Sequence, residues 1–147
     1  MRGFFQLAHA KDLLAKLGRD LERIQLAPSD ADPAYDFFVT AEHMLDWLFP
    51  GKNGKLRRES ARKSEPLLQL VSHIATGAKH MVPEAQHHKA VQSTEAPTSV
   101  HPYAPLVVNP DPAVAEALGF SSITTLGLAA KVYDYWRAWF MRNPTAV

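Results

Sequence analysis

Two stretches of the sequence carry histidine and aspartate side chains at spacings that could build a small polar site. His43 and Asp46 lie three residues apart in FFVTAEHMLDWLFP, so they are neighbours on one face of a helix. His73 and His80 lie seven residues apart in LLQLVSHIATGAKHMV and share one helical stripe, with Lys79 beside His80. If the two helices pack against each other, these side chains form one cluster.

Three interpretations of this cluster remain open. In the first, the histidines are structural and hydrogen-bond to carboxylates or to the backbone. In the second, His43, Asp46, His73 and His80 ligate a divalent metal such as Zn, Fe or Mn, for which imidazole and carboxylate are suitable ligands. In the third, a histidine paired with Asp46 or Lys79 performs acid–base catalysis, because imidazole titrates near neutral pH.

A basic segment follows the first of these helices. GKNGKLRRESARK holds six basic residues and one acidic residue, and such a concentration of charge can bind the phosphates of a nucleic acid. The segment has no aromatic residues on which bases could stack, so the alternative is a solvated loop that keeps the protein in solution. The candidate binding residues are Lys55, Arg57, Arg58 and Arg62.

Hydrophobic periodicity predicts the elements that position these residues. We expect helices over about residues 4–26, 33–49, 65–82 and 121–142, a loop over 51–63 that turns helical near its end, and a helical turn at 113–118. Residues 83–112 contain six of the eleven prolines, which predicts a long irregular crossover with one short strand or hairpin near residues 106–108. The expected fold class is all-α (mainly α): a four-helix bundle-like single domain over residues 1–147.

The first expected helix is amphipathic. Its apolar stripe consists of Ala10, Leu14, Leu17, Leu21 and Ile24, whereas Asp20 falls among the lysines and arginines of the opposite face. We therefore expect an amphipathic surface helix with Asp20 on its polar face.

The last expected helix carries an aromatic cluster, VYDYWRAWF. Tyr135, Trp136, Trp139 and Phe140 exceed what one face of a helix usually buries in so small a domain. Either the rest of the chain covers them or a second copy does, and we expect a homodimer.

Composition excludes several classes of protein. The 147 residues include 46% hydrophobic and 21% charged residues with a net charge of +1, values typical of a globular chain. There is no cysteine, hence no disulfide, thiolate metal site or cysteine nucleophile. No apolar run is long enough to span a membrane, and the first residues lack the pattern of a secretory signal. We expect a cytoplasmic protein without a membrane partner.

The helices containing His-x-x-Asp-Trp and Ser-His-x-x-x-Gly-Ala-Lys-His, together with Leu-Val-Val and the aromatic last helix, resemble a family of small bacterial and phage-associated helical proteins that has no assigned activity. The architecture is also similar to that of HEPN helical bundles, many of which are ribonucleases or nucleotide-binding proteins of phage defence. The HEPN ribonuclease signature is an arginine followed by a histidine, and the last helix here has Arg137 and Arg142 but no histidine. That resemblance therefore concerns architecture only.

These observations predict a non-enzymatic interaction or regulatory protein from a mobile-element or phage-defence context. The alternative is a nuclease-like or metal-dependent hydrolase with its site on the helices that carry His43 and His73.

Overall fold

The computed structural model describes residues 4–79 and 89–146. The expected all-α, four-helix bundle is wrong, because the described residues form six α-helices, one 3-10 turn and a three-stranded antiparallel sheet. In chain order these are α1 (Ala10–Leu26), α2 (Ala31–Leu48), the 3-10 turn η1 (Lys52–Gly54), α3 (Lys55–Ser64), α4 (Pro66–Lys79), β1 (Val91–Glu95), β2 (Val107–Pro110), α5 (Pro112–Leu118), β3 (Ile123–Thr124) and α6 (Thr125–Arg142).

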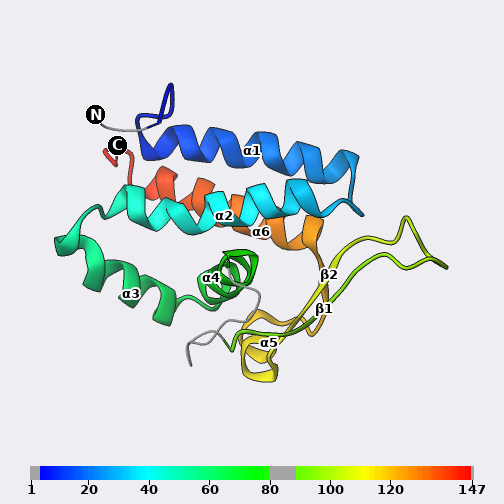
Figure 1. The fold of residues 1–147 in the computed structure, drawn as a ribbon. Coiled ribbons are helices and arrows are strands. Elements are labelled where there is room, and N and C mark those ends of the chain that lie inside the picture. The colour runs from blue at the N-terminus through cyan, green and yellow to red at the C-terminus, as the bar shows by residue number, and fades with distance from the viewer. Residues whose placement is uncertain (1–3, 80–88, 147) are drawn as a thin grey trace.

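Three long helices, α1, α2 and α6, lie side by side and form the upper layer of the molecule (Figure 1). Below them α4 crosses the layer: it is viewed nearly end-on in Figure 1, whereas α2 runs across the page. The two helices that carry His43 and His73 therefore do pack against each other, but α4 crosses α2 steeply.

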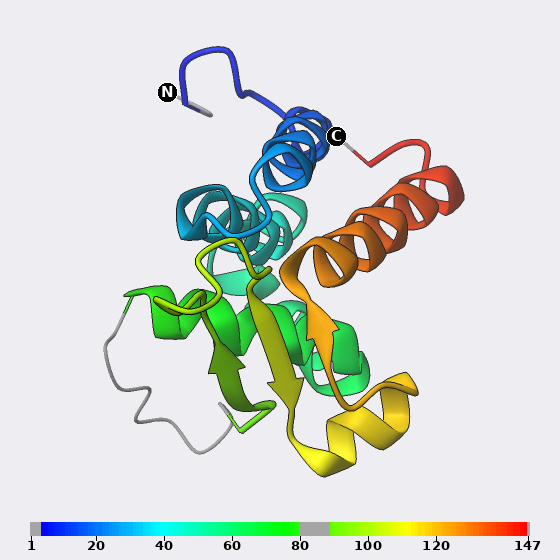
Figure 2. The ribbon, with the colours of Figure 1, turned by 90° about the vertical axis from the view of Figure 1, so that its right-hand side faces the viewer.

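The sheet fills part of the segment that was expected to be an irregular crossover. β2 is its central strand, paired antiparallel with β1 (Thr94 opposite Val108) and with β3 (Val108 opposite Ile123), and the strands lie next to α4 (Figure 2). Prolines exclude a helix here, but the β-branched residues of β2 suit a strand. The short strand expected at residues 106–108 thus lies at Val107–Pro110 and belongs to a larger sheet.

A helix, α3, occupies most of the segment that was expected to be a loop. Its residues are largely good helix formers. Gly54 directly precedes the helix and lets the chain pass close to the end of α2, because a Cβ at that position would lie 1.9 Å from the carbonyl oxygen of Phe49. None of the described residues of α3 is buried. Contacts with both α2 and α4 hold it in place.

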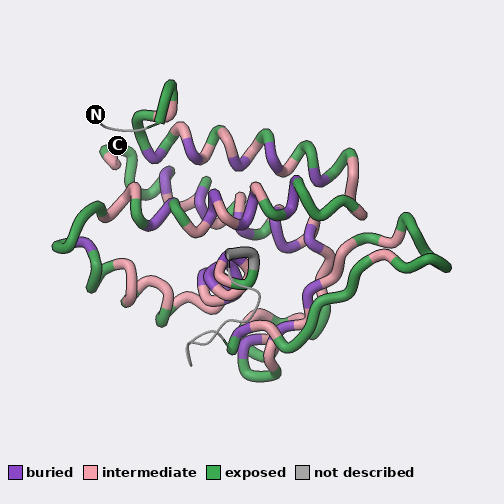
Figure 3. Tube along the Cα trace, viewed as in Figure 1, coloured by how far each residue is buried: buried purple, intermediate pink, exposed green. Residues whose placement is uncertain are grey.

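The hydrophobic core lies among α1, α2, α6 and α4, where the buried positions of these helices face one another (Figure 3). Its largest fully buried side chains include Trp136, Phe37, Phe38 and Met44. Among the described residues, no helix has both the length and the apolar character needed to cross a bilayer.

Candidate functional site

The candidate residues His43, Asp46 and His73 have different surroundings in the structure. His43 is exposed on α2. Asp46 forms an ion pair with Arg58 of α3, with 3.0 Å between Oδ1 and Nε. His73 is partly buried, and its Nδ1 accepts a hydrogen bond of 3.0 Å from the backbone N–H of Val91 at the start of β1. Burial lowers the pKa of His73, which favours the neutral imidazole that this bond requires.

The metal site has no support in the part of the chain that the structure describes. There, no group of three or more histidine, aspartate or glutamate side chains could hold an ion. His80 and the side chain of Lys79 lie outside the described residues.

A polar cluster does join α2 and α4, but it is built on Glu42 and Ser72. Arg62 of α3 donates from Nε to Glu42 Oε1 at 2.8 Å, and its Nη2 lies 2.6 Å from the same oxygen. The hydroxyl of Ser72 donates to that oxygen at 3.4 Å. Three helices therefore meet at one carboxylate oxygen.

The environment of Glu42 perturbs its titration. Desolvation by burial raises the pKa of Glu42 above its ordinary value, and the Arg62 guanidinium opposes that rise. A carboxyl group with a perturbed pKa beside a hydroxyl in a cleft is a typical functional-site candidate.

The cleft beside this cluster has a volume of about 690 Å³. The lining residues that the structure describes come from α2, α3 and α4. All of these described residues are polar or charged: Glu42, Glu59, Arg62, Lys63, Gln69, Ser72 and Thr76. Such a lining offers charged and hydrogen-bonding groups to a small ligand.

The basic residues proposed to bind nucleic acid have mostly structural partners. Arg58 donates to the carbonyls of Phe49 and Gly51 at the end of α2, and Arg62 is paired with Glu42. Lys55 lies 3.8 Å from Glu59 in an exposed ion pair. Arg57 is exposed and stacks over the ring of Phe49, with 4.5 Å from its Cζ to the ring centroid. These contacts attach α3 to the end of α2.

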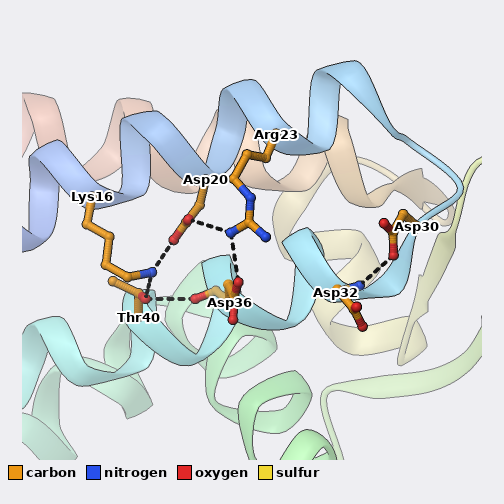
Figure 4. Close-up of polar contacts among 7 residues, drawn as sticks. All are labelled: Lys16, Asp20, Arg23, Asp30, Asp32, Asp36 and Thr40. Carbon is orange, nitrogen blue, oxygen red and sulfur yellow. Dashed lines mark hydrogen bonds and ion pairs between the residues drawn. The ribbon is translucent and has the colours of Figure 1, made fainter.

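A second polar network lies between α1 and α2 (Figure 4). Asp20 is 4% exposed and accepts hydrogen bonds from Lys16 and from Arg23, the latter at 3.2 Å. Lys16 also donates to Thr40 at 2.9 Å, and Arg23 to Asp36 at 2.7 Å. Asp20 was expected on the polar face of α1 but lies on its buried face. Because every charge in the network is paired, we assign the network to the packing of the two helices.

A groove lined by aromatic and polar side chains runs between α3 and the C-terminal half of α6. It consists of two depressions, of about 400 and 370 Å³, which share Phe49, Arg57 and Trp139. Trp136 closes its floor, whereas Leu56 on α3 is 77% exposed beside it. The groove therefore offers aromatic surface next to a cationic side chain.

Comparison with protein-family models, with curated proteins and with solved structures finds no match for this chain. The resemblance to phage-associated helical proteins and to HEPN bundles therefore stays a prediction.

Proposed function

We propose that the protein is a non-enzymatic interaction protein that binds an acidic segment of a partner polypeptide in the groove between α3 and α6. One observation carries the proposal: Arg57 lies on the rim of an aromatic groove, stacked on Phe49, and has no carboxylate partner among the described residues. An exposed guanidinium next to apolar surface can pair with a partner's carboxylate while the groove receives an apolar side chain.

The shape of the groove supports a polypeptide partner. Its two depressions follow α6 from Tyr135 to Asn143, which is about 12 Å along a helix. That length matches two turns of a helical segment or a short extended peptide, the usual forms in which a groove takes a peptide. The exposed Leu56 adds an apolar contact on the α3 side.

The setting of this interaction is also part of the proposal. A cytoplasmic location and a regulatory role in a mobile-element or phage-defence context remain predictions from the sequence. Nucleic acid as a partner has weaker support, because Arg58 and Arg62 are both held in contacts within the chain.

The alternative, a nuclease-like or metal-dependent hydrolase, is supported by the raised pKa of Glu42 beside Ser72. Against it, Asp46 is paired with Arg58, and His73 accepts a hydrogen bond from Val91. Stoichiometric metal in protein purified without a tag would favour the hydrolase.

A random peptide library displayed on phage tests the proposal directly. Selection on the immobilised protein should enrich peptides that combine an aromatic or aliphatic residue with Asp or Glu. Leu56→Glu and Arg57→Glu should each abolish binding of the enriched peptides. Leu26→Glu is the matched control, because Leu26 is also an exposed leucine, at the end of α1.

Two results would contradict the proposal. Either the library yields no enriched peptide, or the enriched peptides bind Leu56→Glu and Leu26→Glu equally well. Circular dichroism of each variant separates a lost interaction from a lost fold.

A further inference from the structure

The cleft at the junction of α2, α3 and α4 has one carboxylate oxygen without a hydrogen bond and one cation without an ion pair among the described residues. All three contacts of the Glu42 carboxylate, two from Arg62 and one from Ser72, fall on Oε1. Glu42 Oε2 therefore has no hydrogen bond within the described residues, and it is not one of the fully enclosed atoms.

The second of these groups is a cation. Lys63, at the end of α3, lines the same cleft and is exposed, and its ammonium group has no ion pair among the residues that the structure describes. Its backbone is held in place, since Gln69 of α4 donates to the Lys63 carbonyl at 2.9 Å.

The remaining charges of the described lining are already neutralised. Arg62 is paired with Glu42 at 2.6 Å, and Glu59 lies 3.8 Å from Lys55. A ligand therefore meets one available anionic oxygen and one available cation on separate elements of a polar cleft. A ligand with a single charge would satisfy only one of them.

We propose that this cleft binds a small zwitterion of the amino-acid class, with its ammonium group on Glu42 Oε2 and its carboxylate on Lys63. The hydroxyls of Ser72 and Thr76 supply further polar contacts on the α4 side. The volume of about 690 Å³ lies within the usual range for small-molecule sites and accommodates a free amino acid together with its side chain. This site is distinct from the α3–α6 groove, because it uses the other side of α3.

Isothermal titration calorimetry with the full chain and each of the twenty amino acids tests this proposal. At least one amino acid should bind. For that amino acid, the N-acetyl derivative lacks the ammonium group and the C-terminal amide lacks the carboxylate, so each should bind at least about tenfold more weakly.

The protein side is tested with two variants and two controls. Glu42→Gln and Lys63→Ala should each weaken binding by at least about tenfold. Glu22→Gln on α1 and Lys52→Ala in η1 remove exposed charges outside the cleft lining and should leave the affinity unchanged.

Three results would overturn the proposal: no amino acid binds at millimolar concentration, the N-acetyl derivative binds as well as the free amino acid, or Lys63→Ala binds as the wild type does. If Glu42→Gln fails to fold, the Lys63→Ala variant and the two derivatives still decide the outcome.

Discussion

Ser72 of α4 donates a hydrogen bond of 3.4 Å to Glu42 of α2. Glu42 directly precedes His43 in the sequence, and Ser72 directly precedes His73. Successive residues on a helix point about 100° apart. The two helices with the candidate histidines therefore do meet, but the side chains at their junction belong to the residues that precede those histidines. His73 points instead toward β1.

The first prediction concerns the ion pair that attaches α3 to α2. The side chains of Glu42 and Arg62 are 19% and 25% exposed, so solvent screens their attraction only in part. A double-mutant cycle with Glu42→Gln and Arg62→Met, measured by urea unfolding, should give a coupling of about 1–2 kcal/mol. The exposed pair Lys55–Glu59 is the control and should give less than about 0.5 kcal/mol. Equal couplings would mean that the Glu42–Arg62 pair contributes no more than a surface contact.

The second prediction is a pH dependence caused by His73. Because burial lowers the pKa of His73 in the folded state, the unfolded chain binds this proton more tightly. The stability contributed by the neutral imidazole is present above the ordinary value of 6.5 and is lost as pH falls through that value toward the folded pKa. The free energy of unfolding should decrease over this range.

His73→Asn tests this assignment, since the asparagine carbonyl can accept the Val91 N–H but does not titrate. The variant should show a flatter dependence of stability on pH below 6.5. His101→Asn, at an exposed loop position, should keep the wild-type dependence. If both variants behave as the wild type does, another group is responsible.

The third prediction concerns the network between α1 and α2. Asp20→Ala removes the shared acceptor of Lys16 and Arg23, and we expect a loss of about 1–3 kcal/mol in the free energy of unfolding. Asp134→Ala is the control: its side chain is 74% exposed and lies 3.8 Å from Arg137, so the loss should stay below about 0.5 kcal/mol. Similar losses would show that the network contributes no more than an exposed pair.

The sequence predicts the long helices because their signals are local. Apolar periodicity placed α1, α2, α4 and α6, and Gly119, in the left-handed conformation with φ of 77°, ends α5 as expected. Asp20 shows where the pattern misleads. The buried positions of α1 are Ala10, Leu13, Leu17, Asp20 and Ile24, so a charged residue occupies the inward stripe because Lys16 and Arg23 neutralise it there.

The sequence predicts one short strand and a helical end to the 51–63 segment, but the full sheet and the full length of α3 could not be predicted because they depend on contacts distant in sequence. β1 (VQSTE) is exposed from its second residue onward, so no apolar alternation marks it, and pairing with β2 makes it a strand. β3 has only two residues. The Glu42 cluster was missed for the same reason: the sequence does not show that Arg62 packs against α2, and without that contact nothing distinguishes Glu42 from the other polar residues of its helix.

The fourth prediction concerns the aromatic cluster of α6, which the fold divides in two. Trp136 and Phe140 are 1% and 7% exposed and belong to the core of a single chain, whereas Trp139 is partly buried and lines the groove beside α3. Trp136→Ala should therefore cost about 3–5 kcal/mol of stability. Trp139→Glu should remain folded, with native circular dichroism and a cooperative thermal transition.

The same variant tests the predicted homodimer. If Trp139 packs against a second copy, the wild type sediments as a dimer and Trp139→Glu as a folded monomer, because a carboxylate cannot be buried unpaired at a symmetric interface. Met141→Glu is the matched control, since Met141 lies on the same helix, is 80% exposed and does not line the groove; it should leave the dimer intact. A wild type that sediments as a monomer at tens of micromolar would contradict the dimer, and the exposed part of Trp139 would then belong to the peptide groove alone.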